Sequence, residues 1–196
     1  QFLMRELTHR VKNNLQIISS LLNIQANSLK NESAIDAIKM AKNRILTISH
    51  LEDKISIKKD SVELDIFIKS LCDNVIKALS DDEHLKFKSN YDLTKTAIKN
   101  LNITMIGLIL NELITNTTKY AFDDFKPENE LNITSSIHKK KLRIVISDNG
   151  KGYSKTKVKH DKSLGIELVS EMVEQLNCTI RINSTTGTRN VIEIPL

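Results

Sequence analysis

The stretch Ile103-Thr-Met-Ile-Gly-Leu-Ile-Leu-Asn-Glu112-Leu-Ile-Thr-Asn116-Thr117-Thr-Lys119-Tyr120 decides the fold of the larger part of the chain. Its apolar content and helical spacing predict a helix from about residue 103 to residue 121. Glu112, Asn116 and Lys119 are separated by four and then three residues, so they share one face of that helix. Thr117 is expected on the other side, toward a core.

The polar face of this helix suits a magnesium–triphosphate complex. Asn116 offers a neutral oxygen to Mg²⁺, which keeps several waters and takes few protein ligands. Lys119 can neutralise phosphate charge, and Glu112 can orient or deprotonate a nucleophile. The competing interpretation is a solvated polar helix face, and this motif alone does not separate the two.

A second motif, Asp148-Asn149-Gly150-Lys151-Gly152, follows an apolar strand at residues 142–147. A carboxylate at a strand end can accept a hydrogen bond from an amine such as adenine N6. The two glycines let the backbone turn sharply and approach a flat ligand. An ordinary Asp-Asn-Gly turn is the competing interpretation.

A third motif, Ser163-Leu164-Gly165-Ile166-Glu167-Leu168-Val169, places a small residue just before an apolar helix expected at residues 164–176. The free N–H groups and the dipole of a helix start favour phosphate. Gly187-Thr188 is expected in the turn before the last strand, where the hydroxyl could reach a phosphate.

The elements around these motifs predict an α/β sandwich, with one mixed sheet and helices on one face. A short strand is expected at residues 62–65 and an amphipathic helix at 66–79. Further strands are expected at 85–91, 97–100, 131–138, 141–147, 179–183 and 190–194. We therefore place an ATP-binding domain at residues 62–196.

The first part of the chain, residues 1–58, predicts two long helices. One apolar stripe occupies Leu7, Val11, Leu15, Ile18, Leu22 and Leu29; a second begins after an expected N-cap at Ser33. An antiparallel hairpin cannot cover both stripes alone, so we expect a homodimer that forms a four-helix bundle. The alternative is a hairpin that folds back on the second domain.

The composition excludes several classes of protein. The longest apolar stretches are too short for the roughly 20 residues that span a bilayer, and no signal peptide pattern is present. A net charge of +5 with few aromatic residues does not predict nucleic-acid binding, because the lysines are dispersed. The run His138-Lys139-Lys140-Lys141 is read as a solvated hairpin turn, and Cys72 and Cys178 as buried thiols in a cytoplasmic protein. The chain starts in mid-helix, as an excised piece of a longer protein would.

The three motifs and Gly187-Thr188, in their order and spacing, resemble the GHKL-type ATP-binding domain that histidine kinases share with DNA gyrase and related ATPases. The resemblance implies that Asn116 binds Mg²⁺, that Asp148 reads the adenine amine and that the glycine motifs flank a mobile lid. The ATP-binding residues it implies are Asn116, Lys119, Tyr120, Asp148, Gly150, Gly152, Ser163, Leu164, Gly165 and Thr188. The third motif has a single glycine where many members have more, and the lid segment at residues 153–162 is short and lysine-rich.

The first helix carries Glu6-Leu-Thr-His9-Arg10-Val11-Lys12-Asn13-Asn14-Leu15-Gln16, and its exposed polar face includes His9, Asn13 and Gln16. A neutral imidazole can attack a γ-phosphate. The string resembles the dimerisation and phosphotransfer domain of the variant HisKA histidine kinases, which are related to the HWE kinases. This implies that His9 is the phosphorylated residue.

No acidic residue follows His9 directly, so Glu112 becomes the candidate base, with Glu6 a weaker one. Asn13 is a candidate for positioning a water during dephosphorylation of a partner.

Together the resemblances predict the cytoplasmic core of a two-component sensor histidine kinase, which uses Mg²⁺ and ATP and passes its phosphoryl group to a response regulator receiver domain. Two rivals remain. One is a GHKL serine kinase of the anti-sigma type, and the other is a non-catalytic dimeric nucleotide-sensing module. The chemical stability of the protein-bound phosphate separates them.

Overall fold

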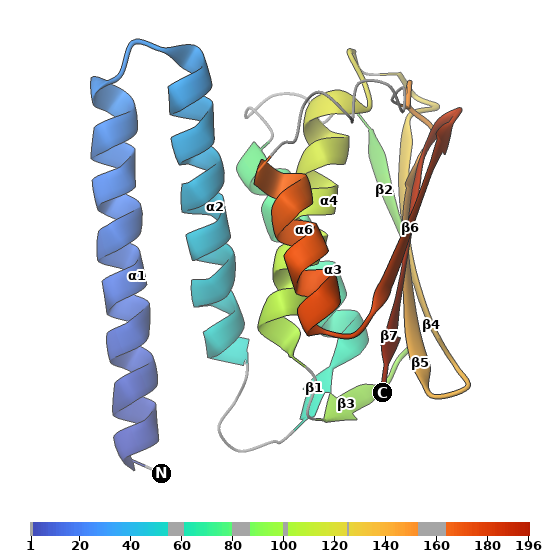
Figure 1. Cartoon of the computed structure of the whole chain (residues 1–196), viewed down its shortest axis with the longest axis horizontal. Coiled ribbons are helices and arrows are strands. Elements are labelled where there is room, and N and C mark those ends of the chain that lie inside the picture. Colours follow the sequence, from blue (N-terminus) through green and yellow to red (C-terminus); the bar gives the residue numbers. More distant parts are fainter. Residues whose placement is uncertain (1, 55–60, 80–86, 100–101, 125, 153–163) are drawn as a thin grey trace. The chain divides into compact units, whose positions relative to one another are not determined.

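The computed structural model describes residues 2–54, 61–79, 87–99, 102–124, 126–152 and 164–196 (Figure 1). The chain divides into two compact units, Gln1–Val62 and Glu63–Leu196. The first is helical and the second combines helices with a sheet. Parts of three expected elements, at residues 55–58, 85–86 and 100, lie outside the described residues.

The first unit is a hairpin of α1 (Phe2–Ser28) and α2 (Glu32–Lys54), which pack along each other. The side-chain oxygen of Asn31 accepts a hydrogen bond from the backbone N–H of Ala34 at 3.1 Å. Asn31 therefore caps α2, and the expected cap at Ser33 is wrong. An asparagine before the first turn satisfies a backbone donor that the helix itself leaves free.

The apolar stripe of α1 is only partly buried within the chain. Leu15 and Leu22 are half-buried, whereas Val11 and Ile18 of the same predicted stripe are 42% and 43% exposed. Small residues, Ser19 and Ala26, are buried instead. The hairpin by itself therefore leaves apolar surface on α1 exposed.

The second unit contains a five-stranded mixed sheet covered by helices (Figure 1). The strand order is β2 (Lys88–Asp92), β4 (Glu130–His138), β5 (Lys141–Asp148), β7 (Gly187–Pro195) and β6 (Thr179–Thr185). β2 runs parallel to β4 and the remaining pairs are antiparallel. Helices α3 (Leu64–Leu79), α4 (Ile103–Tyr120) and α6 (Leu164–Gln175) lie on one face of the sheet. The predicted α/β sandwich, with one mixed sheet and helices on one face, is confirmed, and together with the helical hairpin it gives the chain the α+β fold class.

The core lies between this sheet and the three helices, because apolar side chains alternate along the strands with polar ones. Its fully buried members include Phe67, Ile68, Ile106, Ile109, Leu110, Ile114, Leu131, Ile133, Leu142, Ile144 and Ile146. Cys72 and Cys178 are buried free thiols, as predicted, and burial raises the pKa of Cys72 to about 12.

Several strands differ from the expectation at their ends. The expected strand at residues 62–65 is β1 (Ser61–Glu63), which pairs with β3 (Ala97–Lys99), and α3 begins at Leu64. The last two strands are longer than predicted, and the single residue Thr186 connects them. Gly187 and Thr188 therefore open β7 itself, and do not lie in a preceding turn.

The turn between β4 and β5 is built from lysines. Lys139 and Lys140 have φ values of 47° and 58°, as a two-residue turn of type I′ requires. His138, Lys139, Lys140 and Lys141 are all exposed, which agrees with the expected solvated turn. Asparagine and glycine adopt this backbone at lower cost than lysine does.

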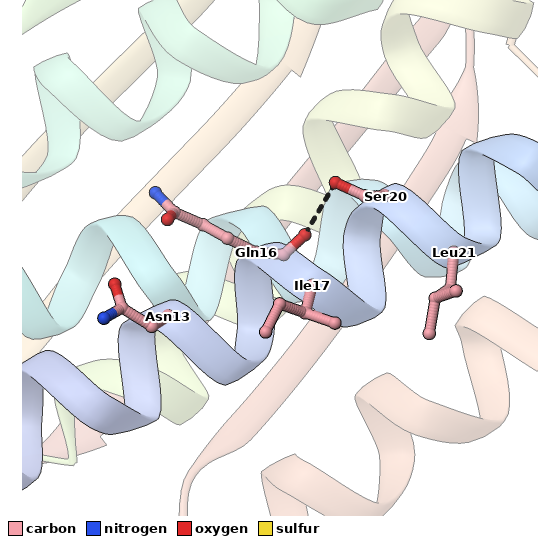
Figure 2. A pocket seen from close by; sticks show the side chains of 5 residues that line it. All are labelled: Asn13, Gln16, Ile17, Ser20 and Leu21. Carbon is pink, nitrogen blue, oxygen red and sulfur yellow. Dashed lines mark hydrogen bonds between the residues drawn. The ribbon is translucent and has the colours of Figure 1, made fainter.

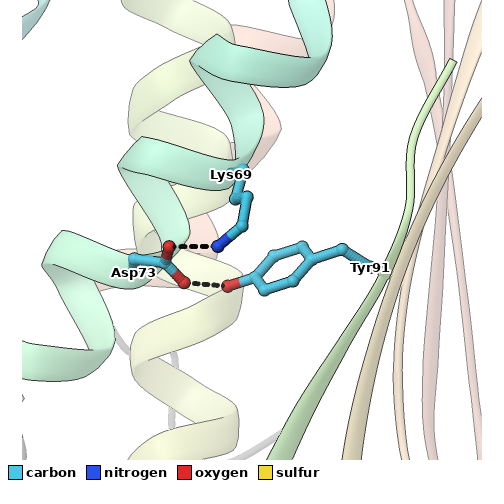
Figure 3. A network of polar contacts seen from close by, with 3 residues as sticks. All are labelled: Lys69, Asp73 and Tyr91. Carbon is cyan, nitrogen blue, oxygen red and sulfur yellow. Dashed lines mark hydrogen bonds and ion pairs between the residues drawn. The ribbon is translucent and has the colours of Figure 1, made fainter. Parts of the chain in front are cut away.

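A polar network joins α3 to the edge strand β2 (Figure 3). Asp73 accepts a hydrogen bond from the Tyr91 hydroxyl at 2.5 Å and forms an ion pair with Lys69 at 2.7 Å. The Lys69 ammonium stands 4.7 Å from the centre of the Tyr91 ring. Burial, with the bond to Asp73, raises the pKa of Tyr91. The tyrosine therefore remains a hydrogen-bond donor to Asp73 over the physiological range.

Candidate functional site

Asp148, the last residue of β5, is held by backbone groups from two segments. Its Oδ1 accepts hydrogen bonds from the N–H groups of Gly150 and Thr188, each at 3.0 Å. Gly150 follows in the same loop, while Thr188 comes from the start of β7, which pairs with β5. The register of two strands thus fixes one carboxylate oxygen.

The loop after Asp148 needs glycine because its backbone is in close contact with other main-chain atoms. A Cβ at Gly150 would clash with the carbonyl oxygen of Ala121, which also accepts a hydrogen bond from the N–H of Lys151 at 3.0 Å. Gly152 has a φ of +63°. The end of α4 and the loop are therefore packed main chain against main chain.

Gly187 has the tightest surroundings in this loop region. Its φ is +78°, and a Cβ there would overlap the carbonyl oxygen of Asp148. We expect Gly187→Ala to lower the free energy of unfolding of the second unit by about 3 kcal/mol or more, from left-handed backbone strain and the clash. The melting temperature, measured by circular dichroism, should fall by roughly 10 °C.

The neighbouring exposed Thr186 provides the matched control for this prediction. Thr186→Ala should leave the melting temperature within about 1–2 °C of the wild type, because an exposed side chain that is truncated without strain changes little. If the Gly187→Ala variant had the melting temperature of the wild type, β7 would have to be able to shift away from Asp148.

The other oxygen of Asp148 faces α4. The hydroxyl of Thr117 donates to Asp148 Oδ2 at 3.4 Å, and both side chains are buried. Burial raises the pKa of Asp148, while the hydrogen bonds from Thr188, Gly150 and Thr117 act in the opposite direction. The helical spacing predicted correctly that Thr117 faces the core. Helical spacing could not predict the hydrogen bond to Asp148, because the two residues are 31 positions apart in sequence and belong to different elements.

Asn149 is a second residue that sequence reasoning did not single out. Its side-chain amide donates to the carbonyl of Glu128 at 2.6 Å, and its side-chain oxygen accepts from the N–H of Glu130 at 2.8 Å. Both partners lie where the chain enters β4. An asparagine next to a turn is the available signal, because its side chain can replace two missing backbone bonds.

The polar residues of α4 range from buried to exposed. Glu112 is 1% exposed, and the side-chain amide of Asn111 donates to it at 3.1 Å. Asn116 and Lys119 are half-buried, and Tyr120 is 59% exposed. The interpretation as a solvated polar face is therefore wrong for Glu112. Along α4, these polar side chains become more exposed from Glu112 to Tyr120.

Two further predicted contacts lie at the start of α6. Leu164 begins this helix and Gly165 is buried within it, while Ser163 lies outside the described residues. The first turn of a helix carries backbone N–H groups without helical partners, and these favour phosphate.

The proposed phosphoacceptor region lies on α1. His9 is within this helix, and Asn13 is exposed one turn later. Asn13, Gln16, Ile17, Ser20 and Leu21 line a pocket, in which the Ser20 hydroxyl donates to the Gln16 carbonyl at 3.0 Å (Figure 2).

The donor set fits Mg²⁺ through a single protein oxygen. In the described part of the chain, no three His, Cys, Asp or Glu side chains are grouped as a metal site. Asn116 carries a neutral amide oxygen on a partly exposed side chain, one turn after the buried Glu112. Mg²⁺ commonly takes one or two protein oxygens and completes its shell with water and phosphate.

A buried strand-end carboxylate, glycines packed on its loop and a polar central helix define an ATP-binding domain of the GHKL class attached to a helical hairpin. A family model described as "Histidine kinase" matches residues 6–79, and one described as "Histidine kinase-, DNA gyrase B-, and HSP90-like ATPase" matches residues 101–196. Together the two models match most of the chain, which belongs to the sensor histidine kinase family.

Comparison with individual proteins agrees with this family. The chain is 27% identical over 197 residues to "Sensor histidine kinase PdtaS" of Mycobacterium tuberculosis, covering 98% of this chain and 39% of that protein. It is 25% identical to "Blue-light-activated histidine kinase 2" of Erythrobacter litoralis, covering 97% and 56%. The chain thus spans only part of the length of these relatives.

Solved structures share the fold. The histidine kinase domain of the Erythrobacter litoralis EL346 blue-light activated histidine kinase superposes with a TM-score of 0.69 at 23% identity, covering 98% of this chain and 90% of that one. In the described residues, no helix has the length and apolar character needed to cross a membrane.

Proposed function

We propose that this chain is the cytoplasmic transmitter core of a two-component sensor histidine kinase. It binds Mg²⁺ and ATP in the domain at residues 62–196 and transfers the γ-phosphoryl group to His9 in the hairpin at residues 1–58. The phosphoryl group then passes to an aspartate of a response regulator receiver domain. The observation that carries the proposal is the buried, backbone-held carboxylate of Asp148, in a chain whose residues 6–79 match a histidine kinase family model.

The nucleotide is recognised at Asp148. Two N–H groups occupy Oδ1, so Oδ2 is the oxygen left to accept a bond from the amine of adenine. A guanine would present its carbonyl oxygen there, opposite a carboxylate, and two acceptors repel. The site is therefore expected to prefer ATP to GTP.

The triphosphate is held by α4 and α6. Asn116 would bind Mg²⁺, whose charge neutralises the phosphates, and Lys119 at the end of α4 adds a further positive charge. Tyr120, Gly150, Gly152, Leu164, Gly165 and Thr188 complete the proposed ATP contacts. Catalysis of this kind rests on positioning and charge neutralisation.

The proposed base is Glu112, which would polarise the imidazole of His9. Glu112 is only 1% exposed, whereas a base must reach the ring nitrogen that it activates. Binding of the nucleotide and approach of the hairpin must therefore open the surroundings of Glu112. For Asn13, its exposure on the same helix as His9 supports the proposed role in positioning water for dephosphorylation.

Labelling with γ-labelled ATP and Mg²⁺ tests the proposed function. Phosphohistidine is acid-labile and alkali-stable, so label with these properties on the purified chain is the expected result. Acid-stable label would instead identify a kinase directed at hydroxyl groups. Measurable ATP binding without any label would identify a nucleotide-sensing module, and the proposed kinase activity would then be wrong for this chain.

The hairpin is proposed to form a homodimer through α1. Ile17, Leu21 and Ile24 follow one another at helical spacing and are 58%, 56% and 63% exposed. Burying such a stripe against a second copy gives a four-helix bundle. Figure 2 shows Ile17 and Leu21 on the same side of α1, with the Gln16 side chain pointing elsewhere.

A charged double variant tests this interface. Ile17→Glu combined with Leu21→Glu should weaken dimerisation by roughly 100-fold or more, because carboxylates would be buried without partners. Sedimentation equilibrium measures the change, and Gln16→Glu is the control that adds charge off the stripe. A double variant that dimerises like the wild type would place the interface elsewhere.

A further inference from the structure

We propose that Thr117 is a positioning residue for nucleotide recognition: its hydroxyl orients Asp148 Oδ2 toward the amine of the bound purine. This inference rests on the proposed ATP-binding function and adds a residue to it. None of the sequence motifs assigned a role to Thr117.

The hydroxyl of Thr117 bonds to a residue outside its own helix. Threonines inside helices often bond back to the carbonyl one turn earlier. The neighbouring Thr118 does so, donating to the carbonyl of Ile114 at 2.9 Å. Thr117 instead donates out of α4, across to β5, and its partner is Asp148 Oδ2. A buried hydroxyl aimed at one oxygen of a ligand-reading carboxylate bears directly on that oxygen's orientation.

The remaining contacts make this orientation matter. Oδ1 cannot turn away, because Gly150 N and Thr188 N hold it at 3.0 Å each. Rotation about the bond to the carboxylate would break both contacts. Thr117 is the side chain that bonds to Oδ2 in the described structure, so it occupies one acceptor position of that oxygen and leaves the other to the purine amine. One turn later, the Ala121 carbonyl accepts from Lys151 N, which docks the same end of α4 on the loop.

The 3.4 Å distance between the Thr117 hydroxyl and Asp148 Oδ2 leaves room for the bond to tighten. Hydroxyl donors usually lie about 2.5–3.0 Å from their acceptors, and hydrogen bonds in ligand-free sites shorten when the ligand binds. A purine amine that approaches Oδ2 draws this oxygen into a fixed position, and Thr117 then holds it from the side of α4. The hydroxyl thus strengthens recognition of the amine, and not of the triphosphate.

The test compares ATP with purine riboside triphosphate, which lacks the exocyclic amine. Dissociation constants are measured by calorimetry for the wild type and for Thr117→Val, which keeps the shape and removes the hydroxyl. Thr117→Val should weaken ATP binding by about 3–10-fold and leave purine riboside triphosphate within about twofold. The ratio between the dissociation constants of purine riboside triphosphate and ATP should therefore be smaller in Thr117→Val than in the wild type.

Three further variants make the result specific. Thr117→Ser should restore the preference, and Thr117→Ala, a second way of removing the hydroxyl, should repeat the valine result. Thr115→Val removes another buried threonine hydroxyl of α4 and should change neither affinity.

Equal weakening of both nucleotides, or an unchanged ATP affinity in Thr117→Val, would overturn the role of Thr117 while leaving the ATP site intact. A wild type that binds neither nucleotide would overturn the proposed function and this inference together.

Discussion

Replacing His9 with glutamine is expected to abolish phosphorylation of the chain. Glutamine keeps a polar side chain on α1 but has no nucleophilic ring nitrogen, so no phosphoryl group can be transferred to that position. Incorporated label should fall by on the order of 10³-fold or more relative to the wild type. ATP affinity should stay within about twofold, because the nucleotide site lies in the other unit.

His138 supplies the matched control for this experiment. It is exposed at the turn between β4 and β5, outside any phosphotransfer motif, and His138→Gln should retain full labelling. Acid-labile label that persisted in the His9 variant would show that another histidine is the acceptor. Label lost together with ATP binding would show instead that the substitution disturbed the nucleotide site.

Asp148→Asn is expected to weaken ATP binding by about 100-fold or more while the domain stays folded. The asparagine oxygen can still accept from Gly150 N and Thr188 N, so its amide nitrogen takes the place of Oδ2. That nitrogen is a donor and would face the donor amine of adenine, with loss of a charge-assisted bond and a buried mismatch. Calorimetry of ATP binding measures the effect.

The stability of this variant gives an independent check with a definite sign. Burial raises the pKa of Asp148 in the folded protein, so its ionisation opposes folding at neutral pH. This cost is present above the folded pKa and disappears as the pH falls below the unfolded pKa. Asparagine does not ionise, so the variant should melt at or above the wild-type temperature at about pH 7, and that advantage should shrink toward about pH 4. If Asp148→Asn melted well below the wild-type temperature, its loss of ATP binding would be explained by unfolding and not by the lost carboxylate.

Much of the fold could be predicted from local sequence pattern. The helical spacing of apolar residues located α1, α2, α3, α4 and α6 within a few residues, and strand alternation located the β4–β5 hairpin. The failures lie at element ends, where a single side chain decides the boundary. Asn31 starts α2 because its side-chain oxygen accepts from the N–H of Ala34, and Ser33 has equal propensity for that role.

The candidate site was predictable as a list of motifs but not as an arrangement. Asp148 and the glycines carry local signals. Thr117 and Asn149 act through partners that are distant in sequence or on another strand, and those partners depend on strand register. Glu112 could not be placed as buried, because a helix face next to polar residues reads as solvent-exposed until the packing of α3 and α6 against α4 is known.

Helix α3 decides where the helical hairpin and the ATP-binding domain should be separated for expression. The histidine kinase family model extends to residue 79, yet α3 buries Leu64, Phe67, Ile68, Leu71, Cys72, Val75 and Ile76 and packs on α4 in the second unit. Tyr91 on β2 also bonds to Asp73 of α3. A separately expressed ATP-binding domain that began after residue 79 would lack one of the helices that cover its sheet. The apolar side chains that pack against α3 would then be exposed to solvent and would promote aggregation. A separately expressed domain has to begin before Leu64.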